Sequence, residues 1–251
     1  MKICICFFGV INRSLKYTIG NIKKNIFQEL EKRGIEYDVY IHNIIVDNVS
    51  TNPTREGIQE DIQHLEDFSK HLKYKERCDT LQSKIDKSIN WNYLKKFGDA
   101  FWMDKILSDR HYCGWNVLYN AIRELISIQK VTKLWLNKQK YDFYLYLRPD
   151  IYYETPLDID SIINNLDKFL IINSNLPTNA LSDVVYGGNY DIMKIIGKRI
   201  EWVPTILNFT QKPYQSELLI YYIINAYKFP YKYFWMNEAP RVRANGELYR
   251  V

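Results

Sequence analysis

Small and charged residues follow the first apolar run of the sequence, where a phosphate group could bind. Gly9, Asn12 and Arg13 come directly after the run Ile3–Phe8. A glycine permits close approach of a ligand to the backbone, and an arginine can pair with a diphosphate. The same residues also fit an ordinary turn with an exposed arginine. Both interpretations stay open at this point.

Arg148-Pro149-Asp150 follows another apolar run, Phe143–Leu147. In open α/β sheets, ligands bind at the carboxyl ends of the strands. A carboxylate held there by a proline-stiffened turn could bind a divalent cation, because hard cations prefer oxygen ligands. Arg148 could neutralise the same phosphates directly. The alternative is a surface turn with a local pair between Arg148 and Asp150.

Two more carboxylates and one histidine come at the ends of expected elements. Asp183 precedes a short apolar run and Gly187-Gly188, a glycine pair that leaves room for a substrate to lie against the backbone. Glu217 begins an apolar helical segment, where the helix dipole alone would favour a carboxylate. His42 ends the second expected strand. A structural polar role for His42 competes there with a role as a base or ligand.

Several common catalytic and metal-binding motifs are absent from the sequence. It contains no GxSxG, HExxH, P-loop or GxGxxG pattern, so the usual support for serine hydrolases, zincins, P-loop NTPases and Rossmann oxidoreductases is missing. His64, His71 and His111 lack metal-ligand spacing. The cysteines have no CxxC spacing, which indicates reduced thiols and a cytoplasmic location. The cysteines are Cys4, Cys6, Cys78 and Cys113.

The elements that must position these residues begin with a strand, a helix and a second strand. Ile3–Phe8 has the continuous apolar character of a strand buried on both faces. Apolar residues then recur at helical spacing from Leu15 to Leu30, with Ser14 as a possible cap and Gly34 as a stop. Tyr37–His42 completes the unit, whose parallel crossover should be right-handed.

The remaining pattern predicts a single α/β domain over residues 1–251 with a mainly parallel sheet. The segment from about 46 to 115 is polar, and we expect it to be a helical insertion outside the sheet. Strands and helices alternate afterwards, and no linker or repeat marks a second domain. The later expected elements are a helix over Leu118–Leu136, strands at Phe143–Leu147, Phe169–Ile172, Val184–Tyr186 and Tyr231–Trp235, and helices at Asp191–Ile200 and Glu217–Tyr227.

Composition and charge exclude several classes of protein. Hydrophobic residues make up 47% and charged residues 25%, the balance of a globular protein rather than a disordered one. The net charge of +5 favours anionic ligands, but basic and acidic residues are interleaved, which argues against a nucleic-acid-binding protein. No stretch is long and apolar enough to span a membrane, and the apolar opening segment does not fit a signal peptide.

The order of these segments resembles small soluble GT-A-like glycosyltransferases of surface-glycan pathways, found in bacteria and in large DNA viruses. The resemblance covers most of the chain outside the insertion, and Arg148-Pro149-Asp150 stands where the family usually has Asp-x-Asp. The segments that carry it are Lys2–Arg13, Gly34–His42, Tyr141–Asp150, Ser182–Gly188 and Ser216–Ile224.

The resemblance implies a GT-A-like (Rossmann-like) α/β/α sandwich that transfers a sugar from a UDP- or GDP-type donor to a hydroxyl of a glycan acceptor. The nucleotide sugar would lie on Gly9, Asn12, Arg13, His42, Arg148 and Asp150. Mn²⁺ or Mg²⁺ would bind near Asp150, which matches the last carboxylate of the family motif. The location would be the cytoplasm, of the host if the protein is viral.

An inverting transfer would need a carboxylate that accepts the proton of the acceptor hydroxyl. Asp183 is the first candidate for this base and Glu217 the second. The alternative is a non-catalytic module, a degenerate transferase that binds a nucleotide sugar or a glycan. The sequence does not distinguish an inverting from a retaining reaction, and it does not identify the donor, the acceptor or the oligomeric state.

Overall fold

The computed structural model describes ten stretches of the chain. These are residues 1–46, 52–53, 59–60, 67–94, 115–138, 140–172, 181–210, 216–234, 240–243 and 245–249. About half of the expected insertion lies outside them, as do His64, His111, Cys113 and Trp235.

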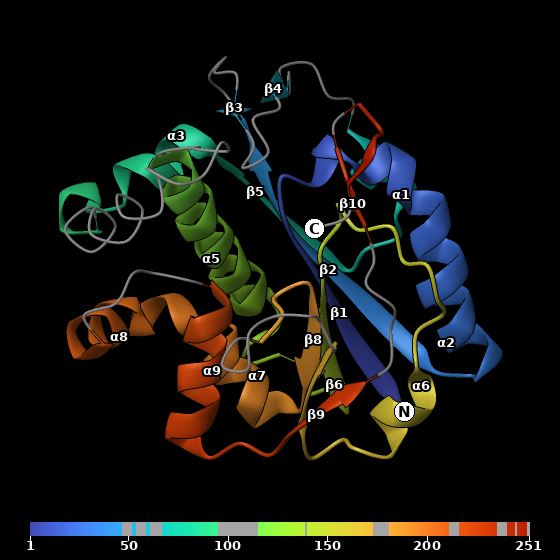
Figure 1. Cartoon of the computed structure of the whole chain (residues 1–251). Helices are drawn as coiled ribbons and strands as arrows, with labels where there is room; N and C mark the ends of the chain where they lie inside the picture. The colour runs from blue at the N-terminus through green and yellow to red at the C-terminus, as the bar shows by residue number, and fades with distance from the viewer. Residues whose placement is uncertain are drawn as a thin grey trace.

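A mixed sheet of seven strands forms the centre of the described structure (Figure 1), in the order β5-β2-β1-β6-β8-β7-β9. Six strands run in the same direction, and only β8 is antiparallel to its two neighbours. The strands are β1 (Lys2–Gly9), β2 (Glu36–Ile45), β5 (Glu76–Leu81), β6 (Phe143–Leu147), β7 (Phe169–Ile172), β8 (Val185–Gly188) and β9 (Tyr231–Phe234). The predicted α/β class and mainly parallel sheet are therefore confirmed.

Strand β1 lies in the interior of this sheet, paired in parallel with β2 on one side and β6 on the other. Its residues alternate between two hydrophobic clusters. Cys4, Cys6 and Phe8 belong to one cluster, and Ile3, Ile5 and Phe7 to the other. This period-2 alternation buries both faces, as the continuous apolar run predicted. Cys4 and Cys6 are unpaired thiols on one face, as expected.

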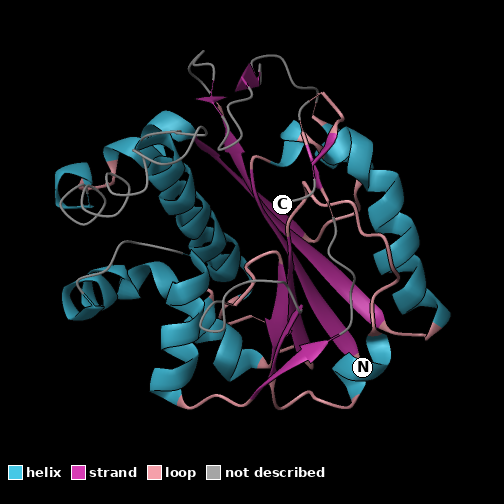
Figure 2. Cartoon of the chain, viewed as in Figure 1, coloured by secondary structure: helices cyan, strands magenta, loops and turns pink. Residues whose placement is uncertain are grey.

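Helices cover both faces of the sheet (Figure 2). One face is covered by α5, α7, α8 and α9, and the other by α1, α2 and α6. The helices are α1 (Leu15–Ile22), α2 (Gln28–Lys32), α3 (Gln82–Lys87), α5 (Trp115–Trp135), α6 (Ile159–Ile163), α7 (Tyr190–Ile196), α8 (Val203–Thr210) and α9 (Ser216–Tyr227). Five residues of π-helix, Lys23–Phe27, join α1 to α2. The result is a three-layered arrangement compatible with a Rossmann-like sandwich.

The first helical segment ends as the sequence predicted but begins differently. Gly34 has φ +63°, in the left-handed region that favours glycine after a helix. Ser14 does not cap α1 with its side chain. Its hydroxyl instead donates to the carbonyl oxygen of Val242 at 2.5 Å. The residue that we expected to cap the helix therefore anchors a distant segment.

Part of the expected insertion belongs to the sheet. Strand β5 pairs in parallel with β2, from Tyr40 opposite Glu76 to Ile45 opposite Leu81. The prediction that this whole segment lies outside the sheet was wrong for these residues. The sequence of β5, Glu-Arg-Cys-Asp-Thr-Leu, is charged because an edge strand needs no continuous apolar character. Helix α3 and the 3₁₀ helix η3 (Phe68–His71) flank the strand.

Two small antiparallel pairs complete the described strands. One joins β3 (Asn52–Pro53) to β4 (Gln59–Glu60), and the other joins β10 (Arg241–Val242) to β11 (Leu248–Tyr249). Two further 3₁₀ helices are η1 (Ile11–Arg13) and η4 (Arg199–Trp202). Within the described stretches, no helix combines the length and apolar character needed to cross a bilayer.

Candidate functional site

The candidate site lies at the sheet edge where β1 and β6 end and where the reversed strand β8 begins. Leu147 at the end of β6 pairs with Val185 at the start of β8. Just beyond them, the backbone N–H of Arg148 donates to the carbonyl oxygen of Val184 at 3.3 Å. The reversal of β8 therefore brings Asp183 to the carboxyl edge of the parallel strands.

The turn after β1 is fixed by the backbone and by two neighbouring side chains. Gly9 has φ +98°, a conformation that side chains rarely permit. Its N–H donates to Oγ of Ser127 at 2.7 Å, and the N–H of Ile11 donates to Oδ1 of Asn43 at 3.1 Å. Oδ1 of Asn12 is buried and has no hydrogen-bond partner among the described residues. The turn thus holds η1 in one position at the edge.

His42 supports this turn from the interior of the protein. The ring is fully buried, with Nδ1 2.6 Å from Oγ of Ser127 and Nε2 3.0 Å from Oγ1 of Thr80. Burial lowers the pKa of His42 to about 3, and the charge of Lys130 adds to this effect, so the ring is neutral at pH 7. Both ring nitrogens are thus bonded within the protein, where the ring orients Ser127, and the contact between His42 and a nucleotide stays a prediction.

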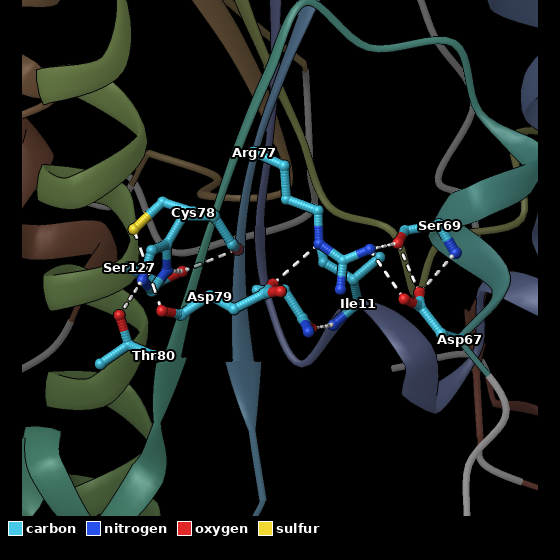
Figure 3. Close-up of polar contacts among 10 residues, drawn as sticks. Ile11, Asp67, Ser69, Arg77, Cys78, Asp79, Thr80 and Ser127 are labelled. Carbon is cyan, nitrogen blue, oxygen red and sulfur yellow. Dashed lines mark hydrogen bonds and ion pairs between the residues drawn. The ribbon is translucent and has the colours of Figure 1, made fainter.

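A second polar network lies beside this one on β5 (Figure 3). Arg77 donates to Oδ1 of Asp79 at 2.8 Å and to Oδ2 of Asp67 at 2.8 Å, and it also contacts the hydroxyl of Ser69. These bonds tie the edge strand to η3. The network is internally paired, so we assign it to holding this edge of the sheet in place.

Asp150 is the centre of the charged contacts at the site. Its two carboxylate oxygens accept from Nε and Nη2 of Arg148 at 3.0 and 2.9 Å. Oδ2 also accepts from Nη2 of Arg13 at 2.9 Å. Burial acts to raise the pKa of Asp150, but the neighbouring guanidinium groups, above all Arg148, hold it well below its usual range. The carboxylate is therefore ionised throughout the physiological range.

These contacts do not fit Asp150 as a ligand of Mn²⁺ or Mg²⁺. Both of its oxygens already accept from guanidinium groups, which a cation would have to displace against their positive charge. Among the residues that the structure describes, no group of three or more His, Cys, Asp or Glu side chains could hold a metal ion. The residues present thus match a paired carboxylate better than a divalent cation site.

The turn that carries Asp150 is fastened on several sides. The hydroxyl of Thr18 on α1 donates to the carbonyl oxygen of Pro149 at 2.7 Å. The hydroxyl of Tyr153 donates to the carbonyl oxygen of Arg148 at 2.9 Å. With these backbone carbonyls bonded from both sides, the charged side chains project from a rigid base.

Glu124 on α5 joins the site, although the sequence analysis did not select it. Its Oε2 accepts from Nη1 of Arg148 at 3.2 Å, and its Oε1 is buried with no hydrogen-bond partner in the described part of the chain. Burial raises the pKa of Glu124, the charge of Asp183 raises it further, and the charges of Arg148 and Arg199 oppose this. Glu124 is therefore the most easily protonated partner of Arg148.

Glu217 and Asp183 form a pair of interacting carboxylates. The backbone N–H of Leu181 donates to the carbonyl oxygen of Glu217 at 3.2 Å, which holds the start of α9 against the segment that carries Asp183. Burial raises the pKa of Glu217 to about 7, with a further contribution from the negative charge of Asp183. Arg241 acts in the opposite direction. The pair thus contains a carboxyl group that titrates near neutral pH.

The β10 strand brings one more guanidinium group to the site. The N–H of Val242 donates to the carbonyl oxygen of Asp150 at 2.7 Å, and Ile151 forms a bridge with Arg241. The positive charge of Arg148 lowers the pKa of Arg241, and burial lowers it further. Arg148 and Arg241 are therefore close enough to repel each other.

Gly187 and Gly188 do not lie where a substrate could reach them. They pair with Leu145 and Tyr144 in the interior of the sheet, away from the carboxyl edge, and both are buried. A Cβ atom on Gly187 would lie 2.6 Å from the carbonyl oxygen of Tyr144 and would also overlap the ring of Phe143. We therefore correct the prediction that this pair admits a substrate, because the packing of the sheet requires the glycine.

The structure brings together most of the residues that the sequence selected. Arg13, Arg148 and Asp150 are in direct contact, and Asp183 and Glu217 lie near them. Sequence reasoning missed Glu124, Ser127 and Arg241. Glu124 and Ser127 are three residues apart and adjoin the buried apolar positions Leu125 and Ile128 of the same helix, which was the available signal. Arg241 had no signal in the sequence.

Comparisons with known proteins do not indicate a function, so the proposal below rests on the geometry of the site. No model of a protein family matches the sequence, and no curated protein matches it.

Proposed function

We propose that the chain is a glycosyltransferase of GT-A-like fold that moves a sugar from a nucleotide-diphosphate donor to a hydroxyl of a glycan acceptor. The observation that carries the proposal is the meeting, at one sheet edge, of the guanidinium groups around Asp150 with the carboxyl group of Glu217, whose pKa is about 7. Such an edge is where open α/β sheets bind ligands. The mostly parallel sheet between two helical layers is compatible with the proposed fold.

The guanidinium groups suit a leaving group that gains negative charge. In the transfer, the acceptor oxygen forms a bond to the anomeric carbon while the bond from that carbon to the diphosphate oxygen breaks. Arg13 and Arg148 are held by Asp150 at the edge, and fixed positive groups stabilise charge that develops on the diphosphate. Preorganised charges of this kind are effective because they need no reorganisation during the reaction.

The carboxyl pair of Glu217 and Asp183 is suited to accept the proton of the acceptor hydroxyl. A general base works best when its pKa is near the working pH, and Glu217 has a pKa of about 7 because of burial and the charge of Asp183. We therefore propose that Glu217 accepts this proton. The negative charge of Asp183 helps to keep the pKa of Glu217 raised. This reverses the order in which the sequence analysis ranked the two residues. The scheme is an inverting reaction.

One observation favours the second candidate, a non-catalytic module that binds a nucleotide sugar or a glycan. Both oxygens of Asp150 are taken up by arginines, and the first carboxylate of the Asp-x-Asp pattern is an arginine here. A degenerate transferase would keep the anion site and lose turnover.

Release of nucleoside diphosphate from a panel of UDP- and GDP-sugars tests the proposal. The assay is run with Mn²⁺, with Mg²⁺ and with EDTA, in the presence and absence of glycan acceptors. We expect turnover with at least one donor and its loss in Glu217→Gln. Asp160→Asn is the matched control, because Asp160 pairs with Arg33 at an exposed position on the helix α6. Donor binding without turnover under every condition would contradict the enzyme proposal and support the non-catalytic binding module.

A further inference from the structure

Two guanidinium groups share the carboxylate of Asp150 at the candidate site, and a third lies beside them. Arg13 and Arg148 both donate to Asp150, and Arg241 is placed beside them by the bridge between its own backbone and Ile151. Asp150 accepts hydrogen bonds from two of these groups, and the negative charge of Asp183 also acts on Arg148 and Arg241. The next carboxylate, Glu124, accepts one bond from Arg148 and is itself the more readily protonated acid.

Backbone contacts fix the position of Arg241 in the fold. Val242 is bonded to the backbone of Asp150 and to the hydroxyl of Ser14, so the strand β10 cannot move away without breaking both bonds. Nε of Arg241 is buried and has no hydrogen-bond partner among the described residues. Holding two repelling guanidinium groups together costs free energy that a bound anion would recover.

We propose that Arg13, Arg148 and Arg241 bind the diphosphate of the donor directly, and that these guanidinium groups take the part that a divalent cation would otherwise play. The identity of the anion rests on the proposed function. Arginine suits this task because its planar group donates two parallel hydrogen bonds to phosphate oxygens. The side chain of Arg13 is 23% exposed and that of Arg148 12% exposed, so both remain in contact with solvent at the edge.

Titration calorimetry with inorganic pyrophosphate in EDTA tests the proposal without any need for turnover. We expect binding by the full chain, and a loss of affinity of about tenfold or more in Arg241→Gln, because a charge-assisted hydrogen bond is removed. Arg33→Gln is the matched control, since Arg33 pairs with Asp160 on the surface and should leave the affinity unchanged. Arg13→Gln provides a second test at a more exposed position if Arg241→Gln does not fold.

The same titration with orthophosphate, UDP and GDP identifies the source of the anion. Tighter binding of a nucleoside diphosphate than of either inorganic anion supports the donor assignment, and equal affinities would overturn it. Pyrophosphate binding that requires Mn²⁺ or Mg²⁺, or an Arg241→Gln variant with wild-type affinity, would overturn the guanidinium site. If the protein binds pyrophosphate in EDTA but turns over no sugar donor, the proposed transferase activity is wrong and the proposed guanidinium site for the anion is supported.

Discussion

Nη2 of Arg13 lies 2.9 Å from Oδ2 of Asp150, although the two residues are 137 positions apart in the sequence. Arg13 follows β1 and Asp150 follows β6, two strands that pair in parallel at the centre of the sheet. The ion pair therefore depends on the parallel pairing that brings the carboxyl ends of these strands side by side. The predictions below start from this contact.

Asp150→Asn should lower the free energy of unfolding by about 3 kcal/mol, because it removes a buried counter-charge from the partly buried guanidinium groups of Arg13 and Arg148. Urea denaturation at pH 7 measures this. The pKa of Asp150 is lower in the folded state, so its stabilisation is present above the unfolded value of ~3.9 and is lost as the pH falls below it. The variant should therefore show a flatter acid limb, and Asp160→Asn should show neither change.

The pH dependence of turnover should report Glu217. A base must be ionised to accept a proton, so kcat/KM should rise with pH through about 7 and then level off. Glu217→Gln should lower kcat by ~10²–10⁴-fold and remove this limb. Asp183→Asn should shift the limb to lower pH, because the charge of Asp183 contributes to the raised pKa. A limb that stays in place in Glu217→Gln would assign the proton to another group.

Glu217 should also affect stability in a direction opposite to Asp150. Its pKa is about 7 in the folded state and ~4.3 when unfolded, so the fold prefers the protonated form. The free energy of unfolding should therefore fall as the pH rises between these two values. Glu217→Gln, which stays neutral, should be more stable than the wild type above pH 7 by roughly 2 kcal/mol, and close to it below the unfolded pKa. Chemical denaturation at several pH values separates the two cases.

Gly187→Ala should destabilise the protein by ~1–3 kcal/mol, because the added methyl group meets the carbonyl oxygen of Tyr144 and the ring of Phe143. Gly20→Ala is the control. Gly20 is exposed on α1 with nothing near its Cβ position, and an alanine there should stabilise the helix by ~0.5–1 kcal/mol. Thermal unfolding of the two variants should shift in opposite directions, and a neutral Gly187→Ala would show that the strands can separate locally.

Ser127→Ala should weaken donor binding without touching the donor. The variant removes the acceptor of the N–H of Gly9 and one contact of the His42 ring, so the turn after β1 loses its support. An unsatisfied buried donor costs ~1–3 kcal/mol. We expect a higher KM for the donor with a smaller change in kcat. Ser88→Ala, at an exposed serine after α3, should leave both constants unchanged. An equal loss of kcat would mean that Ser127 contacts the reacting groups.

The local pattern of the sequence predicted the strands and the helices of the first unit well. Burial on both faces gives β1 and β6 long apolar runs, and helical spacing identified α5 with its end close to Leu136. The direction of β8 could not be predicted, because alternation of side chains is the same in parallel and antiparallel strands. The charged edge strand β5 was missed for a related reason, since only one of its sides pairs with the sheet.

The candidate site was predictable where residues follow strands, and not where helices or distant segments supply them. Arg13 and Asp150 follow β1 and β6 directly, so the rule for open sheets selected both. Glu124 lies within a helix and reaches the edge only through the packing of α5 on β1 and β2. Arg241 depends on backbone contacts with Ile151 that no local pattern encodes.

The separation of 137 positions between the partners of the central ion pair also bears on the time course of folding. Strand β2 follows β1 after one helical segment. Pairing of β1 with β6, in contrast, must close a loop that contains the whole chain between these two strands. Closing a longer loop costs more entropy, and non-local pairing slows folding. The β1–β2 unit is therefore expected to form early, and the affinity for anions should emerge only in a later kinetic phase, when β6 joins its neighbour.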